Sequence, residues 1–267
     1  MLTALRKQIK RTEQVQELMS CILQKEPQLS QVSHSAISLF AGCGGSDVGL
    51  RAAGVEPIWA NEINESACEL YGRVTRTKVM HQGDIRKEIK FPKADILVGC
   101  YPCQGYSQAG RRINADGINF LYQEYDRVLR QVHPVAFIVE NVDGMRFSHN
   151  SHLLTNQLTR FRFAGYRVSW KVLNARDYGL AQDRRRLFIV GIRTSEGLSY
   201  DFPEPTHGPG HFPFRTLRDV IWKYRLAPED SYDAEPLHWY YLSRNRRRTW
   251  GQQAPCIVAH WRHPEAG

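Results

Sequence analysis

Short apolar runs alternate with helical patterns from Ser35 to about residue 200, and this alternation limits the fold more than any other feature of the chain. The runs are Ala36–Phe40, Pro57–Ala60, Ile96–Gly99, Ala136–Val139 and Leu187–Gly191, with helical patterns such as Glu65–Tyr71 and Phe120–Val132 between them. The alternation predicts an α/β fold, a doubly wound and mostly parallel sheet covered by helices on both faces. Ligands of such sheets bind beyond the carboxyl ends of the strands, and we expect a site there.

The chain divides into three predicted parts. Residues 1–35 carry apolar residues at spacings near three and four, which predicts an N-terminal helical extension. Residues 36–200 hold the alternating pattern and form the predicted catalytic and cofactor-binding domain. Four prolines between Asp201 and Phe214 end that pattern, and residues 201–267 are aromatic and basic. We expect this last part to be an incomplete second region.

The net charge of the chain indicates what kind of partner it binds, and its cysteines indicate the cellular compartment. The chain has 36 basic and 27 acidic residues, a net charge of +9, which favours a polyanion such as nucleic acid. No apolar stretch approaches the roughly 18 residues of a membrane span, and the first residues are too charged for a signal peptide. We therefore interpret the six cysteines as free thiols in a reducing cytoplasm and expect no membrane partner.

A glycine-rich loop, Phe40–Gly45, follows the first apolar run and precedes a helical pattern. Glycine admits positive φ and lets a backbone approach a ligand closely, and a helix start attracts negative charge. The loop glycines are Gly42, Gly44 and Gly45. The pattern favours a nucleotide-like cofactor, and the alternative is a tight strand–helix turn without a ligand.

Two acids follow the loop at the spacing expected of a cofactor site. Glu62 ends the second predicted strand, 20 residues after Gly42, where a carboxylate can hold ribose hydroxyls. Asp84 ends the next predicted strand, and its carboxylate can accept a hydrogen bond from an adenine amino group. Asp47 stands where a dinucleotide site needs its third glycine, so the fit to NAD is poor. A cofactor without a pyrophosphate, such as S-adenosylmethionine, fits better.

Cys103 lies between Pro102 and Gln104, just beyond the apolar run Ile96–Gly99, in a turn suited to chemistry. With Cys100 it forms a Cys-x-x-Cys pair, which leaves three alternatives open: a thiol–disulfide site, a zinc knuckle and an inert buried pair. A redox pair usually opens the first helix of a small thioredoxin-like domain, whereas this one lies on about the fourth strand. A zinc knuckle lacks a second Cys/His pair with matching spacing.

A single thiolate at Cys103 suits methyl transfer to cytosine. Its addition to carbon 6 makes carbon 5 able to attack a methyl sulfonium, provided that an acid stabilises ring N3. Glu140 ends a strongly apolar strand, where a carboxylate is costly unless it is used or paired, as it would be in a helix cap or salt bridge. Gln182, Arg184 and Arg186 share one side of the next basic strand. We expect one of these two arginines to contact the base carbonyl and the other to contact a phosphate or brace the cysteine loop. The alternative is a solvated basic edge strand.

In order, these segments resemble the cytosine-5 DNA methyltransferases of bacterial restriction–modification systems. The matching segments are Phe40–Gly45, Asn61-Glu62, Gly83–Ile85, Gly99–Ser107, Glu140–Val142, and Asn174-Ala175 through Gln182–Arg186. The resemblance covers roughly residues 36–200. It implies the S-adenosylmethionine-dependent methyltransferase fold and methyl transfer to carbon 5 of cytosine in double-stranded DNA. It also implies that residues 201–267 begin a target-recognition region.

The resemblance also assigns roles to individual residues. The implied catalytic residues are Cys103, Glu140, Arg184 and Arg186. The implied cofactor-binding residues are Phe40, Gly42, Gly44, Gly45, Glu62, Ile63, Asp84, Ile85 and Pro102. The implied DNA- or base-binding residues are Gln104, Ser107, Arg111, Arg112, Asn141 and Gln182. Three positions depart from the family pattern: Ile63 replaces a frequent aromatic residue, Tyr101 a common proline and Tyr106 a common phenylalanine.

The implied partners are S-adenosylmethionine, which leaves as S-adenosylhomocysteine, and double-stranded DNA with the target base flipped out. No metal is expected. The segment Gly105–Gly117 would close over the base, and phosphate contacts would make binding depend on salt.

The family continues into a recognition domain and a closing helix with a Gly-Asn pair, and this sequence contains no Gly-Asn dipeptide. Two explanations compete: a second polypeptide supplies these parts, or the chain is truncated or degenerate. Two other functions stay open. A tRNA cytosine-5 methyltransferase usually carries cysteine–threonine motifs that are not found here. A non-catalytic DNA-binding subunit is opposed by the intact set of catalytic residues.

Overall fold

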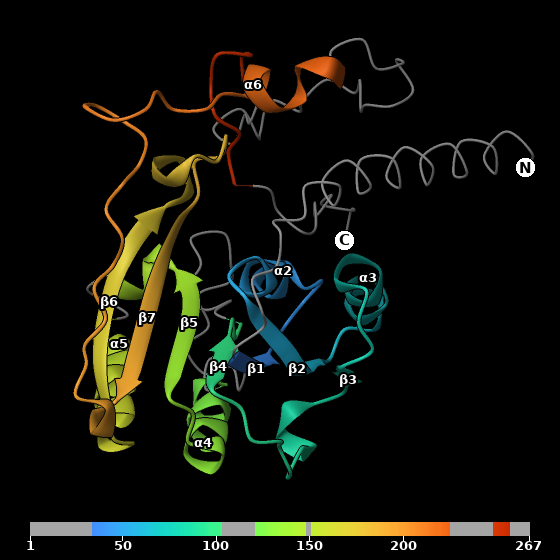
Figure 1. Ribbon diagram of the computed structural model, residues 1–267, viewed down its shortest axis with the longest axis vertical. Helices are drawn as coiled ribbons and strands as arrows, with labels where there is room; N and C mark the ends of the chain where they lie inside the picture. The colour runs from blue at the N-terminus through green and yellow to red at the C-terminus, as the bar shows by residue number, and fades with distance from the viewer. Residues whose placement is uncertain (1–33, 103–120, 148–150, 225–247, 257–267) are drawn as a thin grey trace, which may run out of the picture. The chain divides into compact units, whose positions relative to one another are not determined.

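The computed structural model describes residues 34–102, 121–147, 151–224 and 248–256 (Figure 1). The predicted N-terminal helix therefore lies outside the described residues. The chain divides into two compact units. One comprises Met1–Lys171 and Leu187–Asp201, and the other Val172–Arg186 and Phe202–Gly267. The functional division at residue 200 stays a prediction, and the structure adds residues 172–186 to the second unit.

Seven strands form one mixed sheet in the order β3-β2-β1-β4-β5-β7-β6. They are β1 His34–Leu39, β2 Val55–Glu62, β3 Met80–Gln82, β4 Ile96–Gly99, β5 Ala136–Val142, β6 Tyr166–Asn174 and β7 Arg185–Arg193. The strands from β3 to β5 are parallel to their neighbours. The N–H of Arg193 donates to the carbonyl of Val135 at 2.9 Å, so the end of β7 lies beside the start of β5 and the two strands are antiparallel.

Helices connect the parallel strands and cover the sheet (Figure 1). They are α2 Gly45–Ala52, α3 Glu65–Thr75, α4 Tyr122–Val132 and α5 Ser151–Phe163, and α6 Leu217–Ile221 belongs to the second unit. The strand order runs one way from β1 to β3 and the other way from β4 to β5. Because such crossovers are right-handed, α2 and α3 lie on the opposite face from α4. The predicted doubly wound α/β fold is confirmed.

None of the helices within the described ranges is both long and apolar enough to cross a membrane.

Local sequence accounts for most element boundaries. The five predicted apolar runs lie in strands except for Phe40, which begins the loop after β1. The pattern Glu65–Tyr71 is helical, and Phe120–Val132 is helical from Tyr122 onward, while Phe120 lies outside the described residues. Helix α3 begins after Asn64, whose side chain accepts from the N–H of Ala67 at 2.9 Å, a typical N-cap. The β6 strand was not predicted, because it is a half-exposed edge strand in which Arg167, Ser169 and Lys171 interrupt the apolar residues.

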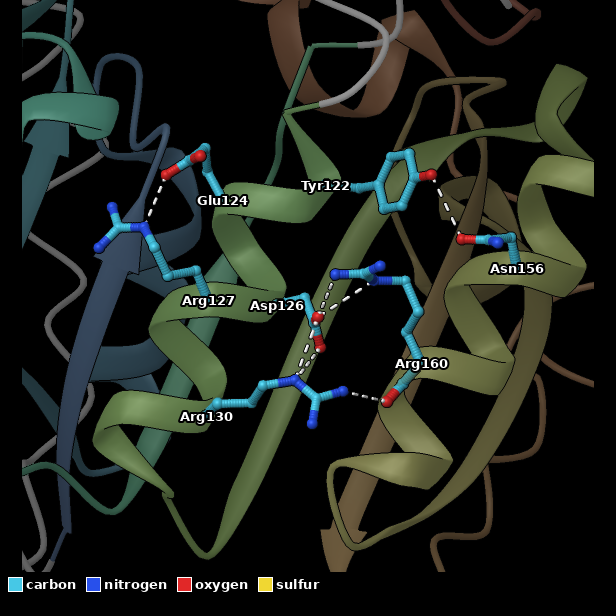
Figure 2. A network of polar contacts seen from close by, with 7 residues as sticks. All are labelled: Tyr122, Glu124, Asp126, Arg127, Arg130, Asn156 and Arg160. Atoms are coloured by element: carbon cyan, nitrogen blue, oxygen red, sulfur yellow. Dashed lines mark hydrogen bonds and ion pairs between the residues drawn. The ribbon is translucent and has the colours of Figure 1, made fainter.

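A buried carboxylate joins α4 to α5 (Figure 2). Asp126 is 1% exposed and accepts from Arg130, one turn along α4, at 3.1 Å and from Arg160 of α5 at 2.6 Å. Arg130 also donates to the carbonyl of Arg160 at 3.0 Å. Beside this network, the Tyr122 hydroxyl donates to Asn156 at 3.3 Å. These bonds fix the two helices that lie behind β4 and β5.

Candidate active site

The carboxyl ends of four parallel strands lie level with one another. Leu39 of β1 pairs with Asn61 of β2 and with Gly99 of β4, and Gly99 pairs with Val139 of β5. The strand order reverses between β1 and β4, which is where ligands of doubly wound sheets bind. The residues at or just past this level are those that the sequence predicts for the site: Phe40, Glu62, Pro102 and Glu140.

The glycine loop turns sharply between β1 and α2. Phe40, Gly42 and Gly44 have φ values of +55°, +55° and +87°. A positive φ is uncommon for a residue with a side chain and is strained, and such residues concentrate at functional sites. The N–H of Ala41 donates to the carbonyl of Asn61 at 3.0 Å, which holds the loop against β2. The N-terminus of α2, with its first backbone N–H groups, therefore lies next to the point at which the strand order of the sheet reverses.

Glu62 ties this loop to the end of β2. Its Oε2 accepts from the N–H of Gly42 at 3.0 Å, and its Oε1 accepts from those of Ile63 and Asn64 at 2.9 Å each. An ionised carboxylate has about four acceptor sites. Three amides leave capacity for one more donor, such as a ribose hydroxyl. Ile63 beside it is 65% exposed and presents an apolar surface at the same strand end.

Asp84 lies beyond β3 and is held in one orientation. Its carboxylate accepts from the guanidinium of Arg86 at 2.9 and 2.5 Å and from the N–H of Arg86 at 3.0 Å. These bonds lower the pKa of Asp84, so it stays an ionised acceptor. Asn61, which is buried, donates to the carbonyl of Gly83 at 3.0 Å and so fixes this turn to β2. Ile85 is 2% exposed and its side chain packs in the core, and its contact with the cofactor stays a prediction.

The nucleophile side of the site is described only up to Pro102. Cys103 lies outside the described residues, as do Gln104, Ser107, Arg111 and Arg112. Glu140 lies on β5, half-buried, one residue past the level of Gly99. Asn141 is 2% exposed, and its amide donates to the carbonyl of Tyr101 at 3.4 Å while accepting from Val142 at 2.8 Å. Both bonds join the Asn141 side chain to backbone groups, and its contact with a base stays a prediction.

The predicted basic residues belong to the second unit. Arg184 and Arg186 place their guanidinium groups 3.4 and 3.3 Å from Sγ of Cys256, and Gln182 donates to the carbonyl of Pro255 at 3.3 Å. All three face the same segment, as strand alternation predicts. Their place relative to Glu140 stays a prediction. No motif in the sequence distinguishes Cys256 from the other thiols.

Sequence reasoning missed the structural use of Asp47. This residue is fully buried in α2, and the hydroxyl of Tyr71 on α3 donates to it at 2.6 Å. Burial raises the pKa of Asp47, and the hydrogen bonds from Tyr71 and Ser46 oppose this shift. The pair joins the helix after the glycine loop to the next helix. The sequence shows Asp47 only as a missing glycine, because the partner is 24 residues away.

The fold and the arrangement of the strand ends are those of a doubly wound α/β protein. The family model of C-5 cytosine-specific DNA methylases matches residues 34–260. Type II methyltransferase M.BsuRI of Bacillus subtilis is 36% identical over 260 residues, which cover 84% of this chain and 58% of that protein. M.BspRI of Lysinibacillus sphaericus is 35% identical over 278 residues, covering 92% and 65%. This chain belongs to the C-5 cytosine-specific DNA methylase family.

A solved structure of similar fold is described as a DNA modification methyltransferase encoded within an E. coli prophage. It has a TM-score of 0.60 and 24% identity, and the match covers 71% of this chain and 55% of that one. A Spodoptera frugiperda DNMT2 variant matches with a TM-score of 0.54 at 20% identity, covering 71% and 60%. The chain spans 58% and 65% of the two curated relatives named above, less than two thirds of their lengths.

Proposed function

We propose that this protein transfers a methyl group from S-adenosylmethionine to carbon 5 of cytosine in double-stranded DNA, within a restriction–modification system. The observation that carries the proposal is the level alignment of the strand ends that bear Phe40, Glu62, Pro102 and Glu140, in a chain of this family. The bacterial relatives support a cytoplasmic site of action.

The described residues fit the proposed cofactor. Glu62 has acceptor capacity left for a ribose hydroxyl after binding three amides, and Asp84 is an ionised acceptor. The exposed side chain of Ile63 suits the face of an adenine, although it cannot stack as an aromatic ring does. The positive φ values of Phe40, Gly42 and Gly44 suit a loop whose backbone approaches a ligand closely. When bound, S-adenosylmethionine supplies an electrophilic methyl group on a sulfonium.

The proposed chemistry uses Cys103 and Glu140. The thiolate of Cys103 forms a bond to carbon 6 of a flipped cytosine, while Glu140 stabilises the protonated ring N3. Carbon 5 would then bond to the methyl group as the sulfonium–methyl bond breaks, which leaves S-adenosylhomocysteine. Loss of the proton from carbon 5, with cleavage of the bond between Sγ of Cys103 and carbon 6, would then release the thiolate. Arg184 and Arg186 serve the base carbonyl and a phosphate in this proposal.

Substitution of the two cysteines separates the nucleophile from its neighbour. Cys103→Ser should abolish methyl transfer from radiolabelled S-adenosylmethionine to DNA while cofactor affinity, measured by calorimetry, stays unchanged. The parent and Cys100→Ser should both form a covalent adduct with DNA containing 5-fluorocytosine, and Cys103→Ser should form none. An adduct that requires Cys100 would refute the assignment. A product methylated on an exocyclic nitrogen would refute the reaction.

Glu62→Gln tests the cofactor site without any turnover. The amide would turn a donor toward backbone N–H groups that now bind an oxygen. Loss of one charge-assisted bond, about 1.5–3 kcal/mol, should raise the dissociation constant for S-adenosylmethionine about 10-fold to 100-fold. Glu56→Gln is the control, because Glu56 lies on the same strand and pairs with Arg51 at 2.9 Å. Equal affinities for both variants would contradict the proposed site.

A second partner is part of the proposal. The 267 printed residues contain no Gly-Asn dipeptide, so the residues that complete the family's cofactor pocket would come from outside them, in a longer chain or in a second polypeptide. The test is methyl transfer by the 267-residue chain with and without the product of the adjacent reading frame. Equal activity in both reactions would reject the second polypeptide.

A further inference from the structure

Tyr101, two residues before Cys103 in the sequence, contacts four other parts of the first unit. It is 3% exposed and lies between Cys100 and Pro102. Its hydroxyl donates to Oε1 of Gln157 on α5, and both residues are buried. Its carbonyl accepts from Asn141, the residue after Glu140. This backbone segment is therefore held from α5 on one side and from the end of β5 on the other.

The ring of Tyr101 adds two aromatic contacts. It lies edge-on to Phe40 of the glycine loop, with centroids 6.2 Å apart. It is tilted against Tyr125 of α4 at 5.8 Å. Both distances are typical of favourable aromatic pairs. The ring thus packs between the proposed cofactor loop and the helix behind the sheet, and the hydroxyl reaches farther, to α5.

Gln157 is an unusual residue for its position. It is 0% exposed, and its Nε2 has no hydrogen-bond partner among the described residues. A buried amide with an unsatisfied donor is costly, and an apolar residue of the same length would avoid that cost. The atom in use is Oε1, which accepts from Tyr101. Among the described residues, the bond to Tyr101 is therefore the only hydrogen bond that offsets the cost of burying the Gln157 amide.

We propose that Tyr101 and Gln157 are positioning residues for the reaction, and that their bond holds the backbone of Tyr101 and Pro102, the two residues that precede Cys103 in the sequence. The inference rests on the proposed function. Cys103 follows Tyr101 by two residues, and the Asn141 amide links the same backbone to the neighbour of Glu140. Since a displacement of about 1 Å can slow a reaction about 100-fold, release of this anchor should slow the chemical step.

Three variants remove the bond while keeping the packing. Tyr101→Phe keeps the ring and its contacts with Phe40 and Tyr125. Gln157→Met keeps the side-chain length and removes both polar atoms, and the double variant removes both partners. Tyr166→Phe is the matched control: Tyr166 is 2% exposed, and its hydroxyl donates to the carbonyl of Pro134 at 2.8 Å, before the opposite end of β5.

The first measurement is the rate of covalent adduct formation on 5-fluorocytosine DNA, with affinities for DNA and cofactor measured separately. Each single variant should slow adduct formation about 10-fold and change both affinities less than about 2-fold. The double variant should be no slower than either single variant, because the two residues act through one bond. Tyr166→Phe should match the parent. Parent rates for Tyr101→Phe and Gln157→Met, or an equal loss in Tyr166→Phe, would overturn the inference.

A second measurement needs no methyl transfer. Mass spectrometry gives the rate at which iodoacetamide alkylates Cys103 relative to Cys43, which is exposed in the glycine loop. Tyr101→Phe and Gln157→Met should change this ratio several-fold, and Tyr166→Phe should leave it unchanged. An unchanged ratio in all variants would refute the positioning role. If the ratio changes in these two variants while the parent forms neither adduct nor methylated DNA, the proposed function is refuted and the effect of the bond on Cys103 stands.

Discussion

Gly44→Ala is the most direct test of how the glycine loop is built. Gly44 caps α2 with φ of +87°, and a Cβ there would lie 2.6 Å from Cγ2 of Thr75 and 2.9 Å from Cδ2 of Tyr71. These neighbours cannot move aside easily. Tyr71 is 0% and Thr75 3% exposed, and the Thr75 hydroxyl donates to the carbonyl of Tyr71 at 2.8 Å. The new methyl group would have to push α3 away from the loop.

Two terms set the size of the effect. A residue with a Cβ in the left-handed region costs roughly 1–2 kcal/mol. Overpacking a filled core costs about 1–3 kcal/mol more. Together the terms lower the free energy of unfolding by about 2–5 kcal/mol, against a typical total of about 5–15 kcal/mol. The variant should therefore remain folded at low temperature and unfold at a clearly lower urea concentration.

Equilibrium urea unfolding, followed by circular dichroism, measures this difference. Gly49→Ala is the control in the same helix, because its Cβ would meet nothing within 4 Å. Alanine is a better helix former than glycine by about 0.8–1.0 kcal/mol, so this variant should be more stable than the parent. If Gly44→Ala unfolds within about 0.5 kcal/mol of the parent, the close approach of loop and α3 is not a constraint on this fold.

Two further substitutions test buried carboxylates. Burial raises the pKa of Asp47 above its ordinary 3.8, so its protonated form stabilises the fold at low pH, and this contribution is lost as pH rises through the folded pKa. In Asp47→Asn the side chain still accepts from Tyr71 but does not titrate. The free energy of unfolding of this variant, relative to that of the parent, should therefore rise with pH from about 4 and then level off. Urea unfolding at a series of pH values measures this difference, and a difference that does not change with pH would contradict the reasoning. Asp126→Ala leaves Arg130 and Arg160 without their buried acceptor, and since both guanidinium groups are over one third exposed, we expect a loss of about 1–3 kcal/mol by urea unfolding.

The sequence predicts the sheet well because its central strands are buried on both faces. Ile96–Gly99 and Ala136–Val139 are continuous apolar runs, and these become β4 and the first part of β5. β6 lies at the edge and has no such run, so its exposed residues look like a loop. The sequence does not predict the strand order itself, because right-handed crossovers limit the arrangements of alternating strands and helices without selecting one.

The contacts that shape the site were less predictable. Glu62 was expected at the cofactor edge, and its bonds to Ile63 and Asn64 are local. Asn61 was seen only as the neighbour of Glu62, yet its amide fixes the turn at Gly83, on the next strand. Such partners depend on the register between strands, which a single sequence does not reveal.

The substitution at Tyr101 shows how a local departure can have a distant compensation. A proline, which the family commonly has there, restricts φ through its ring and so stiffens the backbone before the nucleophile. Tyrosine lacks that restriction, and from sequence alone its presence looks merely tolerable. In the structure its hydroxyl binds Gln157, 56 residues away, and its ring packs against Phe40. Under the positioning proposal, the anchor on α5 replaces the stiffness of proline. The double variant Tyr101→Pro with Gln157→Met should then form the covalent adduct faster than Tyr101→Phe does. If the double variant is as slow as Tyr101→Phe, the restricted φ of proline does not replace the bond between Tyr101 and Gln157.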